Sequence, residues 1–268
     1  MPRSATANID VDTGIPVGIT GPRKRWYHLD KFWRKPNLDA AFNVGDTSSD
    51  VGAAIERAGE ANQYWNLVGA DAVYTDLAFA ANGGITIKPN GTADDQIGIE
   101  PLSVATYHIV GGSALTYPYN KGPAVEWGFT TTSSITNVIF WAGFITGIAD
   151  APGWTDAAQQ DGAYLKWDSS ASANWKIVNN VAGTDDTEID TGIVVKASTA
   201  YSVKVSLDAS SKAFVWIAEA SDLGSGKVFD TVSAHTSSTM IPGLGLEQIA
   251  TATAPTLDVN YVACGRDR

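Results

Sequence analysis

Glu188 and Asp190 are two carboxylates separated by one residue, a spacing that could support acid–base chemistry. In a β-strand, residues i and i+2 project from the same face, so both side chains would lie on one side of a sheet. Retaining glycoside hydrolysis requires two carboxyl groups about 5–5.5 Å apart. No second glutamate follows Asp190 three residues later, and the preceding Asp185–Asp186 is typical of a turn. We therefore interpret the pair as part of a solvated hairpin, and we expect no catalytic residue and no enzymatic activity.

Glu126 is a further acidic candidate, because it precedes Trp127 in a segment with the composition of a strand. It has no partner carboxylate nearby in the sequence, so we interpret it as an outward-facing strand residue. Trp154, in the loop-like stretch Asp150–Thr155, is the best candidate for an exposed aromatic platform on which a sugar ring could stack. Trp167 and Trp175 are more typical of core packing.

The candidate metal ligands are the adjacent aspartates at Asp94–Asp95 and Asp185–Asp186. Calcium takes about six to eight oxygen ligands from carboxylates and carbonyls, yet neither pair belongs to an Asp-x-Asp-x-Asp-Gly run. The single cysteine, Cys264, can form neither an intrachain disulfide nor a zinc cluster. The histidines are isolated from one another and from other ligand types; they are His28, His108 and His235. The sequence therefore predicts no metal and no cofactor.

Cations and large aromatic residues alternate in Arg23–Pro36, which we call the basic-aromatic arm. Such a stretch can bind single-stranded nucleic acid, dock on an acidic protein surface, or pack on its own domain. We favour docking on a protein, because residues 1–36 carry a net charge of +4 and leave −15 on the rest of the chain, which would resist polyanions. The residues predicted to make that contact are Arg23, Lys24, Arg25, Trp26, Tyr27, Lys31, Phe32, Trp33, Arg34 and Lys35.

The whole chain has 268 residues, 26 of them glycine, and a net charge of −11. Hydrophobic residues make up 44%, enough for a large core, which excludes a disordered tail. The acidic balance disfavours nucleic acid and anionic membranes as partners. We expect neither a signal peptide nor a transmembrane segment, because no long apolar stretch is present.

Short β-type segments separated by Gly, Asn, Asp and Pro run from about residue 66 to the end, and they must position any site. Ile85–Lys88, Tyr201–Leu207 and Leu257–Ala263 alternate apolar and polar residues, which predicts one face toward a core and one toward water. Val138–Ile145 and Ala213–Ala218 are apolar throughout, as in strands covered on both faces. Turn residues predict hairpins at Asn82–Gly84 and Pro89–Thr92. One short helix is possible within residues 47–64.

The order of these segments over residues 64–268 resembles a group of tailed-phage virion proteins with a concanavalin A-like jelly-roll sandwich. The segments that carry the resemblance are Trp65–Ala72, Gly84–Ile87, Ala93–Pro101, Val125–Phe129, Ile139–Phe144, Asp161–Trp167, Asn174–Lys176, Gly183–Asp185, Asp190–Ile193, Tyr201–Val205 and Gly265–Arg268. The same fold class includes lectins and family 16 glycoside hydrolases, whose E-x-D-x-x-E pattern is not completed after Glu188.

The expected architecture is thus all-β, an antiparallel jelly-roll sandwich over residues 65–268 behind an arm and linker at residues 1–64. The resemblance implies a non-enzymatic capsid decoration or cement protein on the outer surface of the virion, often a trimer, with the major capsid protein and its own copies as partners. A glycan-binding module on a tail or head fibre is the alternative, and a polysaccharide-cleaving enzyme is the third hypothesis.

Overall fold

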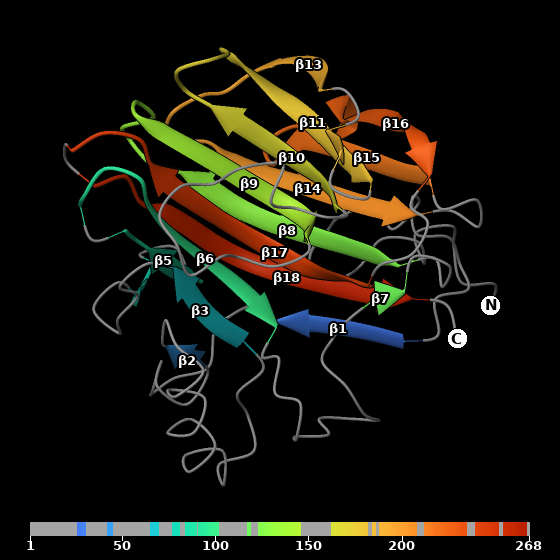
Figure 1. The fold of residues 1–268 in the computed structure, drawn as a ribbon, viewed down its shortest axis with the longest axis horizontal. Helices are drawn as coiled ribbons and strands as arrows, with labels where there is room; N and C mark the ends of the chain where they lie inside the picture. The colour runs from blue at the N-terminus through green and yellow to red at the C-terminus, as the bar shows by residue number, and fades with distance from the viewer. Residues whose placement is uncertain are drawn as a thin grey trace, which may run out of the picture.

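Two β-sheets stacked face to face form the body of the protein in a computed structural model (Figure 1). The structure describes residues 26–30, 42–44, 65–69, 77–80, 84–89, 91–101, 117–118, 123–145, 162–181, 184–185, 188–207, 212–234, 239–251 and 254–266. Within these ranges one short 3-10 turn, η6 (Leu223–Ser225), is the single helical element. No helix of the described part is long and apolar enough to cross a membrane.

The eight-stranded sheet has the order β16-β15-β14-β8-β18-β5-β4, with β1 also paired to β18. Its strands are β16 (Lys227–Ala234), β15 (Lys212–Glu219), β14 (Ala200–Leu207), β8 (Ala124–Thr131), β18 (Leu257–Arg266), β5 (Ile85–Ile87), β4 (Leu77–Phe79) and β1 (Trp26–Asp30). All of their pairings are antiparallel.

The ten-stranded sheet has the order β12-β11-β10-β9-β17-β6-β3-β2, with β13 on β11 and β7 on β17. Its strands are β12 (Thr184–Asp185), β11 (Asn174–Val181), β10 (Gly162–Asp168), β9 (Val138–Ile145), β17 (Thr239–Gln248), β6 (Asp95–Pro101), β3 (Trp65–Gly69), β2 (Phe42–Val44), β13 (Ile189–Val194) and β7 (Tyr117–Pro118). Only the β2–β3 pairing is parallel. The expected antiparallel jelly-roll sandwich is confirmed.

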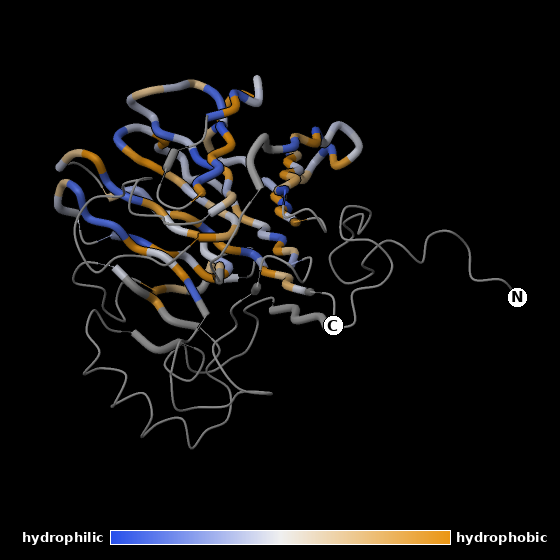
Figure 2. Tube along the Cα trace, turned by 45° about the vertical axis from the view of Figure 1, so that its right-hand side comes forward, coloured by the Kyte–Doolittle hydropathy of each residue, from blue (hydrophilic) through white to orange (hydrophobic). Residues whose placement is uncertain are grey.

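The core fills the space between the sheets and is built from every second residue of the facing strands, as strand periodicity requires. Along many of the described segments hydrophobic and hydrophilic residues follow one another (Figure 2). Five rings meet at its centre in edge-to-face, tilted and stacked contacts between 5.3 and 6.4 Å: Phe129, Phe140, Trp167, Trp175 and Tyr201. Such contacts stabilise beyond the apolar area that they bury. Trp167 and Trp175 are therefore core residues, as expected.

The predicted turns are correct in one case and wrong in the other. The strands on either side of Asn82–Gly84, β4 and β5, pair antiparallel as a hairpin, although residues 81–83 themselves lie outside the described residues. Next to this turn the N–H of Ala80 donates to the carbonyl of Gly84, which has a φ of +84°. The segment Pro89–Thr92 joins β5 of one sheet to β6 of the other, so it does not close a hairpin. Turn chemistry marks a reversal of the chain, but it does not specify which sheet the next strand enters.

The outer face of the eight-stranded sheet is the second point on which the structure corrects the expectation. Tyr201–Leu207 alternates as predicted, yet its polar residues are not in water: Ser202, Lys204 and Ser206 are all buried. In β18 the alternation breaks at a bulge between Val259 and Tyr261. Val138–Ile145 is buried along its whole length between β10 and β17, in agreement with its apolar composition.

The N-terminal part contributes two strands to the sandwich. β1 pairs with β18 in the register Trp26↔Arg266 to Asp30↔Val262, and β2 pairs with β3. The division into an arm up to residue 64 and a sandwich from residue 65 stays a prediction, and the helix expected within residues 47–64 lies outside the described residues.

Candidate functional site

One row of side chains crosses the outer face of the ten-stranded sheet at the end formed by β9, β10, β11 and β13. Trp141, Lys166, Lys176 and Asp190 are directly opposite one another on successive strands. Directly opposed residues project from the same face, so the row is a continuous strip. Trp141 is buried, whereas Lys166 and Lys176 are partly exposed and Asp190 is exposed.

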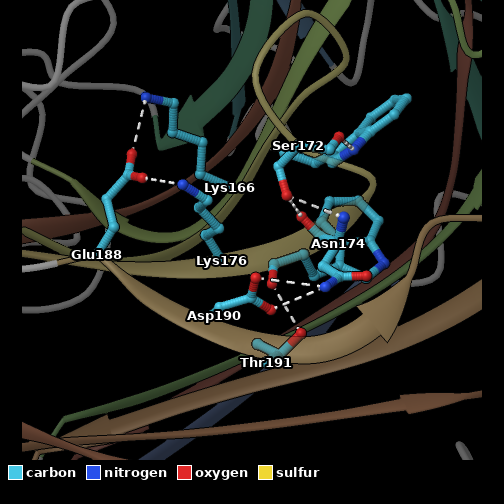
Figure 3. A network of polar contacts seen from close by, with 9 residues as sticks. Lys166, Ser172, Asn174, Lys176, Glu188, Asp190 and Thr191 are labelled. Carbon is cyan, nitrogen blue, oxygen red and sulfur yellow. Dashed lines mark hydrogen bonds and ion pairs between the residues drawn. The ribbon is translucent and has the colours of Figure 1, made fainter.

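Five polar residues of this strip form what we call the polar ladder: Lys166, Asn174, Lys176, Glu188 and Asp190 (Figure 3). Glu188 lies between the two lysines. Lys176 Nζ donates to Glu188 Oε2 at 2.5 Å, and Lys166 Nζ lies 3.7 Å from Oε1. The hydrogen bond to Glu188, reinforced by the charges of Glu188, Asp190 and Asp168, raises the pKa of Lys176, so its ammonium group stays protonated and donates hydrogen bonds.

Asp190 is oriented by a second set of contacts. Asn174 Nδ2 donates to both of its carboxylate oxygens, at 3.0 and 3.3 Å, and the backbone N–H of Gly192 donates to Oδ1 at 2.7 Å. The next residue, Thr191, points inward and donates its hydroxyl to the carbonyl of Trp175 at 2.7 Å. This bond ties the edge strand β13 to β11, so Asp190 is carried on a fixed backbone.

The ladder is a set of planar and cationic hydrogen-bonding groups on rigid strands. Carboxylate oxygens accept, ammonium groups donate and an amide does both. The site can therefore bind a ligand rich in hydroxyl groups. Glu188 and Asp190 do share one face, as their spacing predicts, but each is engaged with donors of the protein rather than facing the other across a cleft.

Glu126 lies on the outer face of the other sheet and is not the exposed residue that the sequence suggests. It is only 7% exposed, and its Oε2 lies 3.5 Å from Nζ of Lys204, which is 1% exposed. Tyr261 donates its hydroxyl to Glu126 Oε1 at 3.3 Å and lies 3.0 Å from the hydroxyl of Ser202. Lys204 is not recognisable from the sequence as the partner of Glu126, because only the register Lys204↔Glu126 places the two side by side.

Three of the four aspartates of the candidate metal-binding pairs, Asp94, Asp95 and Asp185, are described, while Asp186 lies outside the described residues. Asp94 occupies the turn before β6 with a φ of +63°, and its N–H donates to the carbonyl of Gln248 at 2.7 Å. Asp95 is buried at the start of β6, and Asp185 lies in β12. Among the described residues no group of three or more His, Cys, Asp or Glu side chains could hold a metal ion. Cys264 is buried and is not part of a disulfide.

Most of the predicted contact residues lie outside the described residues: Trp154, Arg23, Lys24, Arg25, Lys31, Phe32, Trp33, Arg34 and Lys35. The backbone of Trp26 and Tyr27 is part of β1 and pairs with the last strand of the same chain. Their role in binding a partner stays a prediction.

No family model and no curated protein matches the sequence. Solved structures do match the fold. A protein of unknown function from Shewanella oneidensis MR-1 is 14% identical with a TM-score of 0.59, over 90% of this chain and 86% of that one. A β-glucanase of Bacillus licheniformis is 8% identical, with a TM-score of 0.53 over 90% and 98% of the two chains. Lectin II from Ulex europaeus is 9% identical, with a TM-score of 0.53 over 91% and 100%. These likenesses establish a concanavalin A-like sandwich, a fold on which both glycosidases and lectins are built.

Proposed function

We propose that this chain is a non-catalytic carbohydrate-binding protein and that the polar ladder is its glycan site. The observation that carries the proposal is the strip of Lys166, Lys176, Glu188 and Asp190 across the outer face of the ten-stranded sheet, within reach of solvent. Lectins share this fold, which supports the proposal by analogy.

Sugar hydroxyls both donate and accept, and a site that holds them needs acceptors and donors at fixed positions. Asp190 is held by Asn174 and by the N–H of Gly192, so its orientation is set before a ligand arrives. Such preorganisation lowers the entropy lost on binding. Hydrogen bonds to charged groups contribute about 1.5–3 kcal/mol each, so two or three of them suffice for a measurable affinity.

Binding is favoured over hydrolysis by the partners of Glu188. A glycosidase acid must deliver a proton to the glycosidic oxygen. Glu188 Oε2 accepts a hydrogen bond from Lys176, and the raised pKa of Lys176 keeps that donor charged. Proton delivery by Glu188 would require this contact to break.

The test is a glycan array probed with the folded chain, followed by calorimetric titration with the oligosaccharides that bind. The double variant E188A/D190A should weaken binding by at least about 10-fold, because two charged acceptors are lost. The matched control is D222N, an exposed aspartate beside η6 that is not part of the ladder, which should bind like wild type. Absence of any glycan bound by folded protein refutes the proposal, as does release of reducing sugar that the double variant abolishes.

The virion role implied by the resemblance is a second candidate, supported by the segregation of charge between residues 1–36 and the acidic remainder. In that case the arm would bind the major capsid protein and the sandwich would decorate the outer capsid surface as a trimer. Particle association should then be lost when residues 1–36 are removed, because this truncation takes away all ten predicted contact residues, whereas a glycan site on the ladder would be unaffected.

A further inference from the structure

β16 (Lys227–Ala234) is the last strand on one side of the eight-stranded sheet. One edge pairs with β15 from Lys212↔Ala234 to Ile217↔Lys227, and no described residue pairs with the other edge. An edge strand of this length presents a row of unpaired backbone N–H and C=O groups that another strand can extend.

The two faces of β16 differ. Phe229 packs on the core between the sheets, and Nζ of Lys227, on the same face, approaches the carbonyl of Thr191 in β13 to 3.5 Å. Val228 faces outward, opposite Trp216 of β15, and is 56% exposed. Val228 and Val194 are the two exposed large hydrophobic residues of the described part of the chain.

Trp216 lies next to Val228 on the same outer face, one strand further into the sheet. It is 8% exposed and packs with Ala218, Leu223 and Tyr261. Its ring lies so close to Gly226 that a Cβ there would come within 2.1 Å of Nε1, so the turn before β16 requires glycine. Val228 is therefore the exposed end of a rigid apolar row on a strand with an open edge.

We propose that β16 pairs antiparallel with β16 of a second copy of this chain, with the two-fold axis at Val228, so that the eight-stranded sheet continues across a dimer. Directly opposed residues of an antiparallel pair share a face, so the axis lies at a residue of β16. The positions at the exposed valine and just after it are Val228, Phe229 and Asp230. An axis at Asp230 sets two aspartates opposite each other, which destabilises the pair. An axis at Phe229 places Asp230 against Val228 of the second copy.

An axis at Val228 places valine against valine and leaves Asp230 opposite Gly226 of the second copy. The contact is then apolar at its centre, with Trp216 of each copy beside it. The segment Lys227–Asp230 contains one cation and one anion, so this patch is neutral on a chain with a net charge of −11. Two copies can therefore approach here without the repulsion that the rest of the surface imposes.

The symmetry also closes the assembly. An isologous contact uses the β16 edge of both copies, so neither retains it for a third strand and no fibre grows from it. The product is a dimer, whereas the trimer implied by the sequence resemblance would need a head-to-tail contact between two different surfaces.

The test uses the full chain in solution. Light scattering after size exclusion at about 100 µM, a concentration that populates contacts of micromolar affinity, should give a dimer. V228C should form a disulfide-linked dimer under mild oxidation, because directly opposed Cα atoms lie about 4.5–5.5 Å apart, within the range that a disulfide spans. D230C should not, since the two positions would lie about 14 Å apart along the strands. Cys264 is buried and does not compete.

V228K should raise the dimer dissociation constant at least 10-fold, because a lysine at the two-fold axis faces its own copy. V194K, at the other exposed valine, is the control and should leave it unchanged. Circular dichroism verifies that each variant is folded. A monomer or a trimer at about 100 µM, equal cross-linking of D230C and V228C, or a dimer unaffected by V228K would each overturn the proposal.

Discussion

Replacing Lys204 with methionine removes one half of the buried pair on the outer face of the eight-stranded sheet. Lys204 is 1% exposed and its Nζ lies 3.5 Å from Glu126 Oε2, so K204M leaves a carboxylate that is 7% exposed without its cation. Breaking a buried pair in this way costs about 3–5 kcal/mol, mainly because the desolvated charge remains. For a domain of this size that corresponds to a fall in Tm on the order of 6–20 °C.

The double variant E126M/K204M separates the cost of the unpaired charge from the value of the pair. Replacing both partners with apolar residues of similar volume is often neutral, so most of the lost stability should return. Tyr261 then loses the acceptor Glu126 Oε1 but retains the hydroxyl of Ser202 at 3.0 Å. Urea unfolding of the wild type, E126M, K204M and the double variant gives the coupling free energy directly.

The control for this cycle is K176M on the polar ladder. Lys176 is closer to its partner than Lys204 is, with 2.5 Å to Glu188, but both side chains are partly exposed. Exposed pairs contribute about 0–1 kcal/mol, so K176M should cost far less than K204M despite the shorter contact. A K176M variant as unstable as K204M, or a K204M loss below about 1 kcal/mol, would refute the reasoning that burial rather than distance determines the cost.

Two further predictions concern Tyr201 and β1. Burial raises the pKa of the Tyr201 hydroxyl above its ordinary value of 10.0, so this hydroxyl loses its proton at a lower pH in the unfolded chain than in the folded one. Its contribution to the free energy of unfolding is therefore fully present below pH 10.0 and is lost as the pH rises through the pKa of the folded state. Urea unfolding between pH 9 and 11 should show a shallower decline in Y201F, and identical declines would exclude Tyr201 as the cause. Truncation of residues 1–25 should leave the free energy of unfolding unchanged. Truncation of residues 1–36 also removes β1 and leaves the second edge of β18 unpaired from Val262 to Arg266, so this longer truncation should lower the free energy of unfolding measurably. Equal stability of the two truncated chains would show that β1 does not stabilise the sandwich.

The fold class is visible in the sequence because strand periodicity is local. Val138–Ile145 is apolar at every position and becomes a central strand, and Ile85–Lys88 alternates and is buried at its isoleucines. Register and sheet membership depend on residues far away. The bulge in β18 between Val259 and Tyr261, and the passage of Pro89–Thr92 from one sheet to the other, leave no local signal in composition.

The sequence predicts that the two acidic residues of the polar ladder lie together, but it does not predict that the two lysines lie beside them. The spacing of Glu188 and Asp190 places them on one face, as strand geometry requires. Lys166 and Lys176 precede them by up to 24 residues, and only the register of β10, β11 and β13 sets them opposite one another. Lys204 and Glu126 show the same dependence, since each is an ordinary residue of an alternating strand until β14 and β8 are paired.

The polar ladder and the edge strand β16 lie at the same end of the sandwich. β13 carries Asp190 of the polar ladder, and the same strand lies against β16, where Lys227 Nζ approaches the carbonyl of Thr191. A dimer formed through β16 would therefore carry one ladder beside each side of its two-fold axis. Two such sites on one rigid body bind a surface bearing many glycans more tightly than a single site does, because the second contact is intramolecular. The weak affinity expected of an exposed strip of hydrogen bonds is then compatible with firm attachment to a dense glycan layer.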